Sequence, residues 1–261
     1  MSPEQTGGLT GRVAVITGGG GAIGTAIADA LAQDGARIVI ADLDLTAAER
    51  TAAALPDARA AQADVAYRES CRRLVADTVE RDGSLDILVN DAGLQFVAPI
   101  DEYPDEKFDL LMKVMIYGPF WLTKDALPHM KARGWGRIVN MGSIHSVIAS
   151  ANKSAYTAAK HAILGLTKVT ALEGGAHGVT ANCVCPTYVD TPLVRNQIPP
   201  QAATLGISED AVINDVMLGP AAVKRCLQPA EVAAYVRFLC SDAAGGITGS
   251  AQLIDGGWTA R

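Results

Sequence analysis

Three polar residues in the second half of the chain have types and spacing suited to acid–base chemistry. Tyr156 and Lys160 are four positions apart, so on a helix they share one face, and Ser143 precedes them. A phenol is a weak acid, but an ammonium group one helical turn away favours its phenolate form. A phenolate can take the proton of a substrate hydroxyl, and a serine hydroxyl can stabilise charge on the substrate oxygen. The trio therefore predicts chemistry at an alcohol or a ketone.

A glycine cluster near the N-terminus predicts a phosphate-binding turn. Residues 17–24 have the sequence Thr-Gly-Gly-Gly-Gly-Ala-Ile-Gly, between a short apolar run and a stretch with helical apolar spacing. Glycines allow backbone N–H groups to approach a pyrophosphate, and the following helix directs its positive end at the anion. Combined with the ordered Ser, Tyr and Lys, the turn predicts hydride transfer to or from a nicotinamide dinucleotide. The alternative is a turn that merely joins strand to helix.

The residue that ends the second apolar run favours NAD over NADP. Asp42 follows residues 37–41, where an acidic residue can bind the adenosine ribose hydroxyls. A carboxylate there would repel a 2′-phosphate, and residues 18–21 include no arginine to neutralise one. The alternative is that Asp42 caps a helix near Leu45. Asp64 and Val65 are expected beside the adenine.

The elements that must position these residues alternate along the chain. Apolar, β-branched runs predict strands at 12–16, 37–41, 85–89, 137–141, 180–185 and 252–254, and helical spacing predicts helices at 22–33, 68–81, 106–132, 154–173 and 229–240. Continuous apolar strands separated by helices imply a parallel sheet covered on both faces. We therefore expect an α/β fold: one Rossmann-type, doubly wound domain over residues 1–261.

One segment breaks this alternation. Prolines and glycines interrupt short helical patterns between about residues 191 and 227. Because ligands of open α/β sheets bind beyond the carboxyl ends of the strands, and this segment follows one such end, we expect a mobile substrate lid. The alternative is a plain surface excursion.

Composition excludes several classes of partner. The 261 residues are 49% hydrophobic, and the formal net charge of −6 without a basic cluster argues against nucleic acid or an anionic membrane surface. No N-terminal targeting pattern and no membrane-spanning run is seen, so we expect a cytoplasmic protein with a small-molecule substrate. The five cysteines and four scattered histidines lack the spacing of a metal site, so we expect no metal and reduced, packed thiols.

These motifs together resemble the short-chain dehydrogenase/reductase family over nearly the whole chain. The matching features are Thr-Gly-x-x-x-x-x-Gly at 17–24, Asn-Asp-Ala-Gly at 90–93, Ser143, Tyr156-x-x-x-Lys160 and the segment from Pro186. The resemblance implies that Ser143, Tyr156 and Lys160 are catalytic, and that Thr191 contacts the nicotinamide carboxamide. It also implies a homotetramer. The cofactor-binding set expected from motif and resemblance is Gly18, Gly21, Ile23, Gly24, Asp42, Asp64, Val65, Asn90, Ala92, Gly93, Tyr156, Lys160, Pro186, Val189 and Thr191.

A second set of residues is similar to bacterial D-3-hydroxybutyrate dehydrogenases within that family. It includes Ser143-Ile-His145, residues 149–156, Gln197 and the Asp-Gly-Gly-Trp segment ending at Trp258. The resemblance implies that Gln95, His145, Lys153 and Gln197 converge on a substrate carboxylate, and that Trp258 lies near the methyl group. Ser143, Tyr156 and Tyr188 complete the expected substrate site. A small carboxylate offers little apolar area, so a cation and several donors suit it.

The expected activity is therefore NAD-dependent interconversion of D-3-hydroxybutyrate and acetoacetate. Two alternatives stay open. Tyr188 and the unusual lid sequence allow another 3-oxo compound or a neutral secondary alcohol as substrate. Ala22 in the glycine turn and Met115, where the family usually has an asparagine, allow a dinucleotide-binding protein without catalysis.

Overall fold

The protein is built on one parallel sheet. In the computed structural model, which describes residues 8–260, seven strands lie in the order β3-β2-β1-β4-β5-β6-β7. Their bounds are β1 Val13–Thr17, β2 Arg37–Asp42, β3 Ala58–Gln62, β4 Ile87–Asn90, β5 Gly136–Met141, β6 Val179–Pro186 and β7 Ala251–Ile254. From β1 the chain adds strands outward on one side of the sheet, as β2 and β3, and from β4 it adds them on the other side, as β5, β6 and β7. A crevice therefore forms beyond the carboxyl ends of the neighbouring strands β1 and β4.

The central strands are apolar throughout because both faces of the sheet are covered. In β1, Ala14 and Ile16 face one hydrophobic cluster, whereas Val13 and Val15 face another. Successive side chains of a strand point to opposite faces, so a strand buried on both sides has no polar alternation. This confirms the predicted α/β, doubly wound fold.

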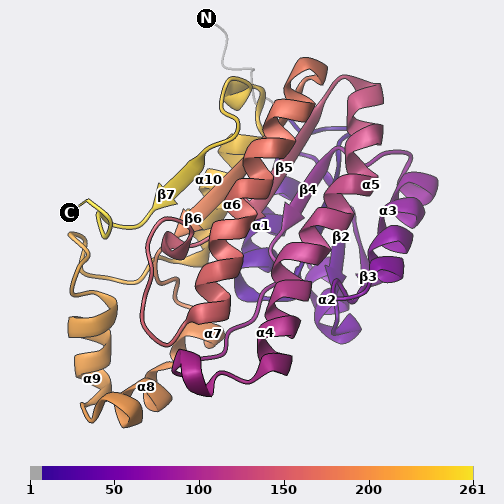
Figure 1. The fold of residues 1–261 in the computed structure, drawn as a ribbon. Coiled ribbons are helices and arrows are strands. Elements are labelled where there is room, and N and C mark those ends of the chain that lie inside the picture. The colour runs from indigo at the N-terminus through magenta and orange to yellow at the C-terminus, as the bar shows by residue number, and fades with distance from the viewer. Residues whose placement is uncertain (1–7, 261) are drawn as a thin grey trace, which may run out of the picture.

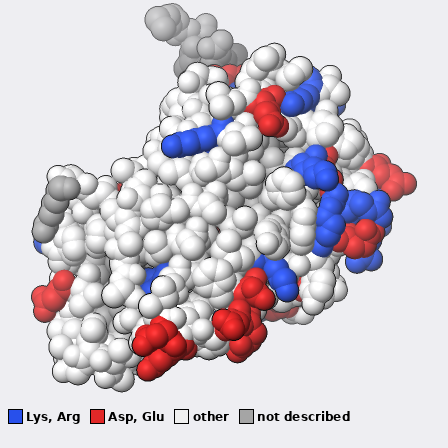
Figure 2. Space-filling model, viewed as in Figure 1, with Lys and Arg blue, Asp and Glu red and all other residues white. Residues whose placement is uncertain are grey.

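Helices form a layer on each face (Figure 1). One cluster includes residues of α1, α2 and α10, and the other includes residues of α3, α5 and α6. The principal helices are α1 Ala22–Gln33, α2 Leu45–Ala53, α3 Arg68–Asp82, α4 Asp105–Met112, α5 Gly118–Arg133, α6 Ser154–Gly174 and α10 Pro229–Cys240. Figure 2 shows acidic and basic side chains interspersed on one face of the molecule, without a basic patch there.

Two elements were missed by the sequence analysis, and one is more complex than expected. The edge strand β3 has the sequence Ala-Arg-Ala-Ala-Gln, whose weak β-propensity conceals it. Helix α2 follows β2 directly and has alanine at four of its nine positions, which leaves little apolar periodicity. The helix expected at 106–132 is present as α4 and α5, joined by a π-helical turn at Lys113–Tyr117.

The segment after β6 forms short helices that pack into a small cluster of their own. They are α7 Pro192–Arg195, α8 Ile198–Leu205, α9 Glu209–Ala211 and a π-helical turn at Val212–Met217. Ala202, Val212, Met217 and Leu218 are buried there. In Figure 1, α8 and α9 stand apart from the sheet at the lower left. The excursion is thus placed as predicted, and its mobility stays a prediction.

Candidate active site

A large cavity lies beyond the carboxyl ends of the strands. It encloses about 1630 Å³, including the space at its mouth, and borders a smaller cavity of about 430 Å³. Thirteen of the fifteen residues in the expected cofactor set line the large cavity: Gly18, Gly21, Ile23, Asp42, Asp64, Val65, Ala92, Gly93, Tyr156, Lys160, Pro186, Val189 and Thr191. These residues come from the ends of five strands, from α1 and α6 and from the segment after β6, so only the fold brings them together.

The glycine turn is packed too tightly for side chains. Gly18 has φ +66°, and a Cβ there would lie 2.9 Å from the Cα of Ala92. At Gly24, a Cβ would lie 2.5 Å from the carbonyl oxygen of Gly18. Only glycine therefore fits at these two positions. The turn leads directly into α1, whose N-terminus presents the positive end of a helix to an anion. Ala22 is the first residue of α1 and lines the cavity, so its methyl group is accommodated.

Asp42 connects this turn to β2. Its Oδ2 accepts a hydrogen bond from the N–H of Gly20 at 2.9 Å, and its Oδ1 accepts one from the N–H of Asp44 at 3.0 Å. The cap of α2 is Asp44, whose side chain accepts from the N–H of Ala47. The alternative role of Asp42 as the helix cap is therefore wrong, and its carboxylate faces the large cavity.

The Ser, Tyr and Lys trio lies where the two cavities meet. Ser143 and Tyr156 line both cavities, and Lys160 lines the larger. Lys160 Nζ donates to the carbonyl oxygen of Met141 at 2.6 Å and lies 5.4 Å from the centre of the Tyr156 ring. The end of β5 thus holds the ammonium group beside the phenol.

His145 connects Ser143 to the loop that precedes α6. Its Nδ1 is 3.2 Å from Ser143 Oγ, and its Nε2 is 2.9 Å from Ser150 Oγ. The backbone N–H of His145 also donates to Ser143 Oγ at 3.2 Å. Burial, with a further effect from the positive charge of Lys153, lowers the pKa of His145 to about 3. The imidazole is therefore neutral at physiological pH.

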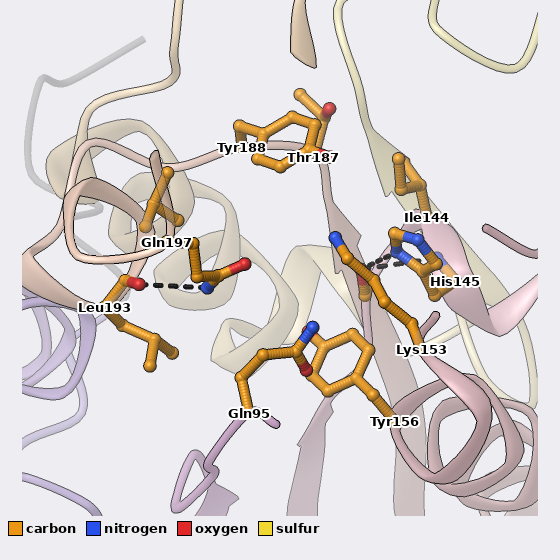
Figure 3. Close-up of a pocket in the computed structure, with 11 residues that line it drawn as sticks. Gln95, Ile144, His145, Lys153, Tyr156, Thr187, Tyr188, Leu193 and Gln197 are labelled. Atoms are coloured by element: carbon orange, nitrogen blue, oxygen red, sulfur yellow. Dashed lines mark hydrogen bonds between the residues drawn. The ribbon is translucent and has the colours of Figure 1, made fainter. Parts of the chain in front are cut away.

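The smaller cavity contains a buried cation. Figure 3 shows Gln95, Lys153 and Gln197, from three separate segments, facing a common space beside Tyr156. Lys153 is 7% exposed, and burial lowers its pKa to about 8. Within residues 8–260 no acidic side chain pairs with it, and its Nζ lies 5.4 Å from the centre of the Tyr188 ring. Gln95 Oε1 is buried without a hydrogen-bond partner in the same part of the chain. The ammonium group is suited to an anionic ligand, and the unpartnered amide oxygen is suited to a hydrogen-bond donor.

Three of the expected site residues lie outside both cavity walls. Gly24 serves packing within the turn, and the buried side chain of Asn90 donates to Asn140 Oδ1. Trp258 turns towards the lid segment, where its indole N–H donates to the carbonyl oxygen of Met217. Asp255 accepts from the N–H groups of Gly257 and Thr259, which shapes the C-terminal turn and directs Trp258 there.

The cavities also include residues that the sequence analysis did not select. Asp91 lines the large cavity, and burial raises its pKa to about 7 despite the opposing charge of Lys160. Leu43, Leu94 and Val114 add apolar wall to the same cavity. Leu43, Asp91 and Leu94 closely follow the ends of strands, and this position could have identified them from the sequence as cavity residues. Met115 is buried in the π-helical turn, and a Cβ on Gly93 would lie 3.8 Å from its Sδ.

No group of three or more His, Cys, Asp or Glu side chains within residues 8–260 is arranged to hold a metal ion. Across the same residues, none of the helices has the length and apolar character needed to span a bilayer.

Fold and site together are those of a Rossmann-type oxidoreductase. Comparison with known proteins makes this more specific: a family model described as Enoyl-(Acyl carrier protein) reductase matches residues 20–259. The chain belongs to the short-chain dehydrogenase/reductase family. Enzymes of this family generally use NAD or NADP.

Several curated proteins are similar over almost their full length. D-beta-hydroxybutyrate dehydrogenase of Rhizobium meliloti is 44% identical, over 96% of this chain and 99% of that protein. The protein of the same name from Cupriavidus necator is 40% identical, over 97% and 100%. An uncharacterized oxidoreductase, YxjF, of Bacillus subtilis is 44% identical, over 96% and 99%.

Proposed function

We propose that this enzyme is an NAD-dependent dehydrogenase that interconverts D-3-hydroxybutyrate and acetoacetate. The observation that carries the proposal is the buried ammonium group of Lys153, which lies in a cavity shared with Ser143 and Tyr156 and has no acidic partner in the described structure. Two relatives at 40% and 44% identity carry the name of this activity.

A buried cation without a counter-ion favours an anionic substrate. Desolvation already lowers the pKa of Lys153, so the free site bears an electrostatic cost that a substrate carboxylate relieves. Gln95 and Gln197 present amide groups to the same space and can bind the second carboxylate oxygen. The cation, together with these amides, would orient a small hydroxy acid with its hydroxyl towards Tyr156. We also propose Tyr188 and the ring edge of His145 as substrate contacts. Trp258 would act indirectly, by positioning the lid segment through its bond to Met217.

The catalytic roles follow from chemistry at the hydroxyl oxygen. Tyr156, beside the Lys160 ammonium group, takes the hydroxyl proton during oxidation and returns it during reduction. Ser143 donates a hydrogen bond to the same oxygen and stabilises its charge. Lys160 keeps its orientation through its bond to Met141, which holds the ammonium group beside the Tyr156 ring. NAD, when bound, would supply the acceptor for the hydride that leaves the substrate carbon.

Asp42 favours NAD over NADP as that cofactor. Its carboxylate faces the large cavity and is itself held by the N–H groups of Gly20 and Asp44, so its charge has a fixed position. A second negative charge on a 2′-phosphate nearby would be repelled. The glycine turn at one end of the cavity would hold the pyrophosphate at the start of α1.

The substrate can be tested with both enantiomers and a charge-removing variant. The wild-type enzyme is expected to produce NADH from D-3-hydroxybutyrate and NAD, and far less from the L form. Lys153→Met should raise the KM for the acid by about a hundredfold, as expected when a buried charge-assisted contact is lost. Lys168→Met, at an exposed lysine of α6, is the control and should leave KM unchanged. No NADH from the D form at millimolar concentration would refute the proposal.

A second candidate is a larger 3-hydroxy acid, another 3-oxo compound or a neutral secondary alcohol. It is favoured by the apolar wall that Ile144, Tyr188, Leu193 and Val194 give to the smaller cavity. A panel of longer 3-hydroxy acids and uncharged secondary alcohols separates these substrates. Retained turnover of an uncharged alcohol by Lys153→Met, with wild-type KM, would favour this candidate.

A further inference from the structure

Ser150 is linked to Ser143 through the two ring nitrogens of His145. We propose that Ser150 is a positioning residue: its hydroxyl donates to His145 Nε2 and so selects the imidazole tautomer whose Nδ1–H donates to Ser143 Oγ. This leaves the hydroxyl proton of Ser143 free for the substrate oxygen. The inference rests on the proposed role of Ser143 as a donor to that oxygen.

The geometry forms one short chain across the site. Ser150 Oγ is 2.9 Å from His145 Nε2, and His145 Nδ1 is 3.2 Å from Ser143 Oγ. His145 and Ser143 are 3% and 7% exposed, so water cannot readily replace the bond between them, whereas Ser150 is partly exposed. His145 lies in the 3₁₀ turn Ile144–Ser146, and Ser150 lies in the loop between that turn and α6.

Counting donors and acceptors at Ser143 shows why the tautomer matters. The hydroxyl oxygen has one proton and two lone pairs, and the backbone N–H of His145 already occupies one lone pair. If Nδ1–H occupies the other, the only remaining interaction is donation of the Ser143 proton. If Nδ1 instead lacks a proton, Ser143 donates to it and can no longer donate elsewhere. A ketone oxygen has only lone pairs, so the second arrangement leaves it without this donor.

A neutral imidazole carries one N–H, so the direction of the hydrogen bond between Ser150 and Nε2 and the state of Nδ1 are linked. The charged and titratable groups that influence His145 electrostatically are Lys153, Lys160 and His161, and all three oppose its protonation, as burial does. The ring therefore stays neutral. With Nδ1 protonated, Nε2 needs a donor, and the Ser150 hydroxyl is within range to supply it.

Nitrogen NMR of the wild-type enzyme tests the tautomer directly. The chain has four histidines, so ¹⁵N-histidine labelling gives few signals, and His145→Asn assigns the one of interest by its loss. We expect His145 to be protonated at Nδ1. Protonation at Nε2 in the wild-type protein would overturn the proposal, and this measurement depends neither on a variant folding nor on the identity of the substrate.

Kinetics of Ser150 variants test whether this tautomer helps Ser143 to donate to the substrate oxygen. Ser150→Ala should lower kcat about tenfold, the effect of one net hydrogen bond, with the Kd for NADH unchanged. Ser150→Thr keeps a hydroxyl and should restore both the kcat and the Nδ1–H tautomer. Ser154→Ala is the matched control, because no described residue bonds its Oγ, and it should resemble the wild type.

Either of two kinetic results would overturn the proposal: wild-type kcat for Ser150→Ala, or Ser150→Thr as slow as Ser150→Ala. The assay uses whichever alcohol the wild-type enzyme oxidises. Inactivity towards D-3-hydroxybutyrate alone would therefore refute the proposed substrate and leave the role of Ser150 open to the same measurements on another alcohol.

Discussion

Asp42 and Gly20 are joined by a hydrogen bond of 2.9 Å from the backbone N–H of the glycine to Oδ2 of the carboxylate. One side chain thus fixes the glycine turn to the end of β2 and places a carboxylate in the wall of the large cavity. Its two contributions, to the structure of the turn and to the choice of cofactor, can be separated experimentally.

Replacing Asp42 should alter cofactor preference. Asp42→Ala is expected to lower kcat/KM for NAD by about a hundredfold, through loss of charged hydrogen bonds, and to raise the NADP-to-NAD ratio of kcat/KM. Steady-state kinetics with both cofactors measures this. The control Asp44→Ala removes the cap of α2 and should cost about 1 kcal/mol of stability without altering the ratio. An unchanged ratio in Asp42→Ala would contradict the role of this carboxylate.

Tyr156→Phe should remove the base while keeping the ring. The aromatic ring packs edge-on against His145, with centroids 5.6 Å apart, and phenylalanine preserves that contact. We expect kcat to fall by about 10² to 10⁴, the usual contribution of general acid–base catalysis, while NADH binding followed by fluorescence is retained. Activity within a few-fold of the wild type would show that another group transfers the proton.

Binding of carboxylates should weaken at alkaline pH because of Lys153. Burial lowers the pKa of its ammonium group to about 8, so the free enzyme loses this positive charge as pH rises through 8. The inhibition constant of acetate, an unreactive carboxylate, should be constant below pH 7 and rise about tenfold per pH unit above 8. In Lys153→Met the constant should be high at every pH. A flat profile for the wild type would exclude Lys153 as the anion site.

Asp91 should destabilise the folded protein above neutral pH. Burial raises its pKa to about 7 in the folded state, whereas the unfolded carboxyl ionises near pH 4. The folded state therefore binds the proton more tightly, and stability falls as pH rises from about 4 through 7. Asp91→Asn should increase the unfolding free energy by up to about 4 kcal/mol at pH 8 and by much less at pH 5, as measured by urea denaturation. Asp101→Asn, at an exposed site, is the control and should show no such difference.

The sequence was most informative where one local rule decided the outcome. Apolar β-branched runs predicted six of the seven strands, because a strand buried on both faces has few alternatives. The bounds of α1 and α10 agree with the prediction, since a glycine turn or a proline begins each helix and apolar spacing continues to its end. The edge strand β3 was missed because its residues have weak intrinsic preference and form a strand only by pairing with β2.

What the sequence by itself determined is the set of chemical groups: a glycine turn between a strand and a helix, an acid at the end of the second strand, and a Ser, Tyr and Lys trio. Only the tertiary structure decided the surroundings of these groups. Burial, which depends on distant segments folding together, lowers the pKa of Lys153 and keeps His145 neutral. Likewise, Trp258 binds the lid segment and Ser150 reaches His145, because hydrogen bonds join groups by distance in space rather than by position in a motif.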